Sequence, residues 1–158
     1  MNINAEGATA GSTGTILLIE DERPTSQGLQ EELNERGFKV DVAKTASEAV
    51  GRLTTLAYRA IVLDLILPND ELPDVASPPP SGVCQWAGVE VLRRIRRGDF
   101  AAQGTAAKVP VFVLTCVLDQ DTRQELESLG IQAFWSKPVG LSIVAERVKL
   151  FFHASPKL

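Results

Sequence analysis

The chain has few of the residues that mark several protein classes. Its 158 residues include only two cysteines and one histidine. Cys84 and Cys116 form no Cys-x-x-Cys pair, so we expect neither a zinc site nor a disulfide framework, and a reducing cytoplasm as the location. The longest apolar runs are far shorter than the roughly 20 residues that a membrane helix needs. We therefore expect no membrane span and no membrane partner.

An excess of positive charge is also absent. Sixteen Lys and Arg face twenty Asp and Glu, which gives a formal charge of -4 and a pI near 5.1. Surfaces that bind nucleic acid or anionic lipid are basic, so we expect no direct nucleic-acid partner. The remaining composition is that of a globular protein, and the length suits one domain. We place this domain at residues 15–153, between an N-terminal tail (1–14) and a C-terminal tail (154–158).

Five strands and five helices are predicted to alternate along this domain. β-Branched runs without alternation predict central strands, and shorter or alternating runs predict edge strands. Helical spacing with caps follows each strand. The central strands cover 15–19, 59–67 and 109–114, the edge strands 38–43 and 131–135, and the helices 24–36, 45–56, 89–97, 121–129 and 141–152. Such alternation predicts an α/β fold, a doubly wound parallel sheet of (β/α)5 type with helices on both faces.

Individual side chains refine this prediction. Thr45 and Glu48 form a capping box, followed by a core side that extends to Leu56. Four arginines, at 93, 94, 96 and 97, lie near a helix C-terminus and are expected to form a solvated face. Residues 69–87 carry Pro73 and three further prolines at 78–80 and exceed the usual connection of about 2 to 6 residues. This inserted loop is either a partner-binding or lid element that uses Trp86 or a solvated, mobile loop.

Acidic side chains follow two of the predicted central strands. Glu20 and Asp21 follow the first strand, and Asp64 ends the third. Ligands of such sheets bind beyond the carboxyl ends of the strands, so these carboxylates should converge. Converging carboxylates raise one pKa or recruit a hard cation, and oxygen ligands favour magnesium. No glycine-rich phosphate motif is present, which disfavours a flavodoxin-like cofactor carrier.

Two further strand ends supply a hydroxyl and an ammonium group. Thr115 ends the fourth strand, and Lys137 follows the fifth in the order Ser136-Lys137-Pro138. Acids for a metal, an isolated carboxylate, a hydroxyl and an ammonium group are what transfer of a phosphoryl group onto a carboxylate requires.

Four motifs then occur in register: IEDE at 19–22, IVLDLILP at 61–68, VLTC at 113–116 and KP at 137–138. Together they resemble a receiver domain of the response-regulator family of two-component signalling, of the stand-alone, chemotaxis type without an attached output domain. The resemblance covers residues 15–152. It implies a flavodoxin-like sheet with strand order 2-1-3-4-5. It also implies a phosphorelay function in which Asp64 receives a phosphoryl group from a histidine kinase or phosphotransfer protein and the domain signals to a downstream protein target.

The resemblance also implies roles for single residues. Asp21 would bind Mg²⁺ directly, Glu20 mainly through a coordinated water, and Asp64 and the backbone carbonyl of Ile66 would complete the ligands. Lys137 would pair with Asp64, before a peptide bond to Pro138 that is cis in the family.

The switch would involve Thr115, which bonds a phosphoryl oxygen, and Phe134, which follows it inward. Phe134 could equally be an ordinary core residue.

The sequence departs from the family pattern in three respects, one of which is Phe134 in place of a tyrosine, a change that removes a hydroxyl but leaves a ring able to change rotamer. Pro68 and Gly88 are 20 positions apart, whereas the family has a glycine within a few residues of this proline. Ile66 and Val117 are apolar where polar side chains orient an attacking water, so we expect slow self-dephosphorylation.

Other readings stay open: a pseudo-receiver that binds proteins without phosphotransfer, a fragment of a hybrid histidine kinase, and a homodimer. We expect no turnover enzyme, although the domain would assist its own phosphorylation and dephosphorylation.

Overall fold

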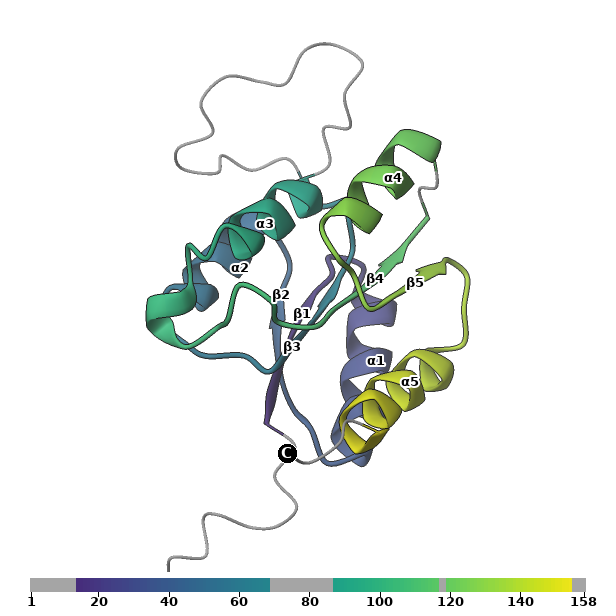
Figure 1. The fold of residues 1–158 in the computed structure, drawn as a ribbon. Coiled ribbons are helices and arrows are strands. Elements are labelled where there is room, and N and C mark those ends of the chain that lie inside the picture. Colours follow the sequence, from purple (N-terminus) through teal and green to yellow (C-terminus); the bar gives the residue numbers. More distant parts are fainter. Residues whose placement is uncertain (1–13, 69–86, 117–118, 155–158) are drawn as a thin grey trace, which may run out of the picture.

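A computed structural model describes residues 14–68, 87–116 and 119–154. Within these residues, five strands alternate with five α-helices, as the sequence predicts (Figure 1). The strands are β1 (Thr15–Ile19), β2 (Lys39–Ala43), β3 (Ala60–Leu63), β4 (Val111–Thr115) and β5 (Ala133–Ser136), and the helices are α1 (Arg23–Glu35), α2 (Ala46–Leu53), α3 (Ala87–Arg96), α4 (Gln120–Ser128) and α5 (Leu141–Ala154), with a short 3-10 helix at Ala101–Gln103.

The sheet is parallel throughout and has the order β2-β1-β3-β4-β5, which confirms the expected topology with β2 and β5 at the edges. Strand β3 is shorter than predicted. Leu63 pairs with Ile19, the last residue of β1. The last hydrogen bond to β1 runs from Asp64 N to the carbonyl of Ile19 at 2.9 Å. Residues 65–67 then leave the sheet and form the loop that carries the site.

Helices cover both faces of the sheet (Figure 1). Helices α1 and α5 pack on one face, where Leu29, Leu33 and Val144 meet Ile16 and other strand residues. Helices α2 and α3 and the single residue Leu126 of α4 pack on the other face. Both faces of the central strands are therefore buried, which explains why their sequences show no alternation. No helix in the described part of the chain is long and apolar enough to cross a membrane.

The capping box forms at the start of α2. The Thr45 hydroxyl accepts a hydrogen bond from Glu48 N at 3.0 Å, and Glu48 Oε2 accepts one from Lys44 N at 3.0 Å. The prediction for Leu56 is wrong, because α2 ends at Leu53 and the helical period does not reach it. Leu56 is instead 46% exposed.

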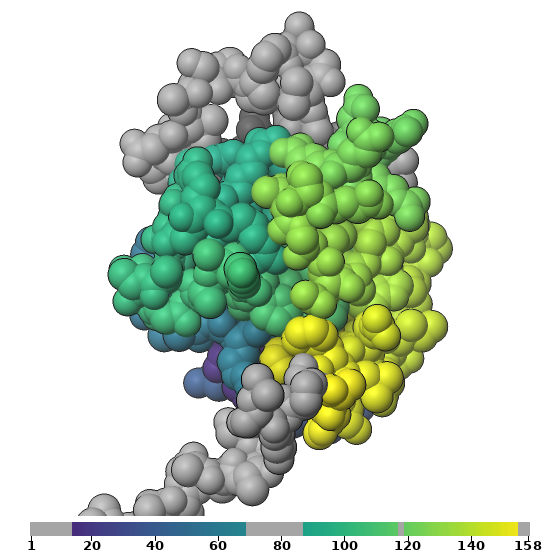
Figure 2. Space-filling view, in the orientation of Figure 1, coloured from purple at the N-terminus to yellow at the C-terminus, as the bar shows by residue number. Residues whose placement is uncertain are grey.

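The solvated arginine face is also wrong for three of the four arginines. Arg94 is buried and pairs with Glu90. Arg93 Nε donates to Glu125 Oε1 at 2.6 Å and so joins α3 to α4, which lie side by side in Figure 2. Arg96 donates to four backbone carbonyls, those of Ala107, Val109, Leu129 and Gly130. Only Arg97 is mainly exposed.

Candidate functional site

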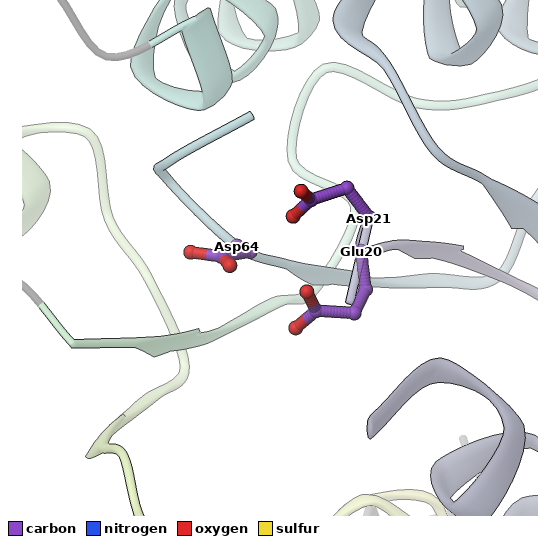
Figure 3. A group of neighbouring side chains, drawn as sticks. All are labelled: Glu20, Asp21 and Asp64. Atoms are coloured by element: carbon purple, nitrogen blue, oxygen red, sulfur yellow. The ribbon is translucent and has the colours of Figure 1, made fainter. Parts of the chain in front are cut away.

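Three carboxylates meet at the carboxyl ends of β1 and β3 (Figure 3). Glu20 and Asp21 directly follow β1, and Asp64 directly follows the neighbouring strand β3. Because Ile19 and Leu63 lie opposite each other in the sheet, the residues that follow them are adjacent. One ligand oxygen from each of the three side chains lies within 4.8 Å of the others. The predicted convergence of these acids is confirmed.

Lys137 lies between two of these carboxylates. Its Nζ is 2.6 Å from Glu20 Oε2 and 3.0 Å from Asp64 Oδ2. Its backbone N donates to the carbonyl of Thr115 at 2.9 Å, which ties the loop after β5 to the end of β4. The bond to Pro138 is cis. The pairing with Asp64 was expected, and the pairing with Glu20 was not.

Burial and hydrogen bonds have opposite effects on the pKa values of Glu20 and Lys137. Burial raises the pKa of Glu20 from 4.5 to about 7, against hydrogen bonds from Lys137 and the Glu22 amide that lower it. Burial lowers the pKa of Lys137, but hydrogen bonds to Glu20 and Asp64 outweigh this effect and place it above its ordinary value. The pKa values of the two partners thus shift in the same direction: the ammonium group of Lys137 stays charged, and burial disfavours the charged form of Glu20.

This donor set fits a hard divalent cation. Carboxylate oxygens are the ligands that Mg²⁺ prefers. Asp21 is exposed, so an ion could reach the three carboxylates from solvent. Burial is the main cause of the raised pKa of Glu20, and a bound cation would favour its charged form. The residues present therefore fit a hard divalent cation such as Mg²⁺.

Asp64 is held from two sides. Its Oδ1 accepts a hydrogen bond from Ile66 N at 3.1 Å, and its Oδ2 accepts one from Lys137. Helix α3 begins against the same loop, where Gly88 N donates to the carbonyl of Leu65 at 3.2 Å. A Cβ at Gly88 would collide with the Asp64 carbonyl oxygen and lie 2.7 Å from Leu65 Cα. Glycine is therefore required where α3 meets the strand end.

A cavity of about 780 Å³ opens over this cluster. The acids and Lys137 line it, together with Ile66 and Cys116. Thr115 is fully buried at the end of β4, next to lining residues on both sides. Phe134 is half-buried in β5 and packs against the core on the α2–α3–α4 side. The structure thus brings Glu20, Asp21, Asp64 and Lys137 together, places Thr115 just beneath the lining and leaves Phe134 in the sheet.

Comparisons with known proteins agree with this arrangement. The chain matches no family model. It is 32% identical over 134 residues to the transcriptional regulatory protein QseB of Haemophilus influenzae, which covers 85% of this chain and 50% of QseB. It is 27% identical to the transcriptional regulatory protein PmrA of Pectobacterium parmentieri with the same coverage. The non-phosphorylated HemR receiver domain of Leptospira biflexa shares the fold with a TM-score of 0.69, covering 91% of this chain and 98% of HemR, at 24% identity. The chain contains a response-regulator receiver domain.

The receiver domain spans about half the length of these curated relatives. The fold and family predicted from the four motifs are confirmed. The residue roles, the metal and the stand-alone character stay predictions. The expectations for Val117 and for residues 69–86 fall outside the described part of the chain.

The sequence reasoning missed one member of the receiver-domain site. Glu22 lies 3.7 Å from Lys137 Nζ through its Oε2 and lines the cavity. The signal was present, since Glu22 is the third acid of the IEDE motif. The sequence did not show that the chain turns here into α1 and brings this side chain back over the lysine.

Proposed function

We propose that this receiver domain is a magnesium-dependent phosphoacceptor in a two-component phosphorelay, with Asp64 as the acceptor. The observation that carries this proposal is the position of Lys137, whose ammonium group contacts buried Glu20 and Asp64 at 2.6 and 3.0 Å. A positive charge fixed beside one buried carboxylate is suited to receive a phosphoryl group at that carboxylate.

In the proposed step, an Asp64 carboxylate oxygen forms a bond to phosphorus, and the bond from phosphorus to the histidine nitrogen of the donor breaks. The product is an aspartyl phosphate, and the donor imidazole leaves as its neutral form after taking up a proton. Lys137 keeps its proton and faces the incoming phosphoryl oxygens. Glu20, Asp21, Asp64 and the carbonyl of Ile66 would hold Mg²⁺, which would offset the charge repulsion between acceptor and donor.

Output would follow from the new charge at Asp64. Thr115 ends the adjacent strand β4, and a hydrogen bond from its hydroxyl to a phosphoryl oxygen would pull this strand end toward the site. Phe134 in the neighbouring strand β5 pairs with Val113 and would follow. The phosphorylated and unphosphorylated surfaces then differ near α4 and β5, which lets a downstream protein distinguish them.

The partners follow from this chemistry. We infer a histidine kinase or phosphotransfer protein as the donor and a downstream protein as the target, in the cytoplasm, with no membrane contact. The relatives QseB and PmrA are transcriptional regulatory proteins, and this chain matches half of each. For the receiver domain itself, whose formal charge with its tails is -4, we infer protein partners rather than direct nucleic-acid contact. It assists its own phosphorylation and dephosphorylation without being a turnover enzyme.

Intact mass spectrometry tests the proposal. The chain is incubated with acetyl phosphate and magnesium chloride, beside Asp64→Ala and beside the native chain with EDTA. We expect the mass of one phosphoryl group to be gained only by the native chain with magnesium. An equal gain in Asp64→Ala, or no gain in any sample, would instead support a pseudo-receiver that binds partners without phosphotransfer.

A further inference from the structure

Glu22 is an acid at the mouth of the site with no role in the proposed phosphotransfer. It is the N-cap residue of α1, but its side chain makes no capping hydrogen bond. Its Oε2 instead accepts a hydrogen bond from Thr25 Oγ1 at 2.9 Å and lies 3.7 Å from Lys137 Nζ. Its side chain is 57% exposed, whereas those of Glu20 and Asp64 are buried. Thr25 therefore holds a solvent-facing carboxylate near the ammonium group of Lys137.

The charges around the cavity are unbalanced. Among the residues that the structure describes, Glu20, Asp21, Glu22 and Asp64 line it with four carboxylates, and Lys137 is the one cation in the lining. Glu20 and Asp64 are each within 3.0 Å of this cation, and Asp21 is the exposed candidate metal ligand. Glu22 adds negative charge where an incoming molecule must pass. A small anion that approaches the cavity meets this negative charge and has no contact surface outside the cavity that offsets the repulsion.

We propose that Glu22 is a specificity-determining residue that disfavours small anions in this cavity, small phosphodonors among them. The part that concerns phosphodonors rests on the proposed function. A protein donor brings its phosphohistidine on a contact surface that supplies binding energy of its own, and it tolerates one unfavourable charge. Acetyl phosphate has no such surface. Glu22 would thus favour phosphotransfer from a protein over phosphorylation by small metabolites.

The expected size of the effect follows from Coulomb's law. One carboxylate several ångströms from a ligand in water changes its local concentration by about threefold for each unit of ligand charge. A doubly charged donor such as acetyl phosphate should gain up to about tenfold when this carboxylate is removed, and singly charged phosphoramidate about threefold. Added salt should reduce both gains, because Glu22 is exposed to screening.

The first experiment measures phosphorylation rates at saturating magnesium and low ionic strength for Glu22→Gln. Glu35→Gln is the matched control, since Glu35 is an exposed glutamate at the opposite end of the same helix. We expect Glu22→Gln to accelerate phosphorylation by acetyl phosphate more than by phosphoramidate, with both gains reduced at high salt. Glu35→Gln should match the native chain. A gain that is equal for the two donors, or equal in the two variants, overturns the proposal.

The second experiment needs neither phosphotransfer nor a metal. Cys116 is exposed and lines the same cavity, so alkylation of its thiol reports on small molecules that enter. Iodoacetate is an anion and iodoacetamide is neutral, and the ratio of their rates cancels any change in thiolate fraction. Peptide mass spectrometry separates Cys116 from Cys84. We expect Glu22→Gln to raise the iodoacetate-to-iodoacetamide ratio about threefold and Glu35→Gln to leave it unchanged.

The two experiments separate the two ideas. An unchanged alkylation ratio in Glu22→Gln overturns the role of Glu22 even if the native chain accepts phosphoryl groups. If Glu22→Gln raises the alkylation ratio but the native chain gains no phosphoryl group, the exclusion of anions by Glu22 is supported. The same result contradicts the proposed phosphoacceptor function.

Discussion

Replacing Glu20 with glutamine tests the electrostatic balance of the site in the metal-free protein. The pKa of this buried carboxyl is about 7 in the folded chain against an ordinary value of 4.5. At pH values between 4.5 and about 7, Glu20 is protonated in the folded chain and ionised in the unfolded chain. The free energy of unfolding should therefore fall as the pH rises from about 4.5 to about 7, and this contribution should be constant above that. Glutamine cannot ionise, so Glu20→Gln should not show this loss.

The pKa shift sets the size of the effect. A shift of 2.5 pKa units, from 4.5 to about 7, corresponds to an upper limit of about 3 kcal/mol. The variant loses the ion pair between Lys137 Nζ and Glu20 Oε2, which are 2.6 Å apart in the native chain. Lys137 keeps its ion pair with Asp64 Oδ2 at 3.0 Å. We expect Glu20→Gln to be more stable than the native chain by about 1 to 3 kcal/mol near pH 8 and to lose this advantage near pH 5.

Urea unfolding with EDTA, followed by circular dichroism across this pH range, measures the difference between the two proteins. Glu127→Gln is the control, because this carboxylate on α4 is 67% exposed and should change stability little at any pH. A Glu20→Gln variant that is less stable than the native chain near pH 8, or a difference that does not vary with pH, would refute the reasoning. Magnesium should stabilise the native chain and stabilise Glu20→Gln less, because one ligand is lost.

Three further predictions concern other parts of the fold. Gly88→Ala should lower the free energy of unfolding by about 1 to 3 kcal/mol and slow phosphorylation, because its Cβ would collide with the backbone of the Asp64 loop. Gly51 has open space around it, so Gly51→Ala should stabilise α2 by up to about 1 kcal/mol in the same urea assay. Arg96→Met should lower the free energy of unfolding by about 2 to 4 kcal/mol, since four carbonyls lose their donor. Arg97 is exposed, so Arg97→Met should lower it by about 0.5 kcal/mol or less. Equal losses in the two variants would contradict a special role for Arg96. The aspartyl phosphate should last well beyond seconds by intact mass, because apolar Ile66 lines the cavity, and Ile66→Asn should shorten its lifetime.

The sequence predicted the fold well because the signals for this architecture are local. A β-branched run without alternation indicates a strand with helices on both faces, and the Thr45 capping box indicates where a helix begins. The ends of elements were less predictable. Leu56 continues the apolar spacing of α2, but the helix stops at Leu53. Strand β3 stops at Leu63, where its pairing with Ile19 of β1 ends, although its sequence stays apolar on to Leu67 apart from Asp64.

The site was predictable to the level of which residues meet, because strand order and strand ends determine it. The pairing inside the site was not. Whether Lys137 contacts Glu20, Asp64 or Glu22 depends on the conformation of a flexible side chain near three carboxylates. Sequence spacing carries no information on this conformation. The arginines of α3 show the same limit. A run of arginines near a helix end is usually solvated, and here Arg96 instead finds free carbonyls on segments distant in the sequence.

The long separation of Pro68 from Gly88 departs from the family pattern beside the site, and the residues on both sides of it are anchored in the core. On one side of the separation, Leu65 and Leu67 are buried beside the site. On the other side, Gly88 N bonds the Leu65 carbonyl and Val89 is fully buried. Each doubling of a connection costs only about 0.6 kcal/mol in closure entropy, which these buried anchors offset. The Asp64 loop is therefore anchored on both flanks, and the two groups that hold the Asp64 carboxylate, Ile66 N and Lys137 Nζ, lie outside the inserted residues.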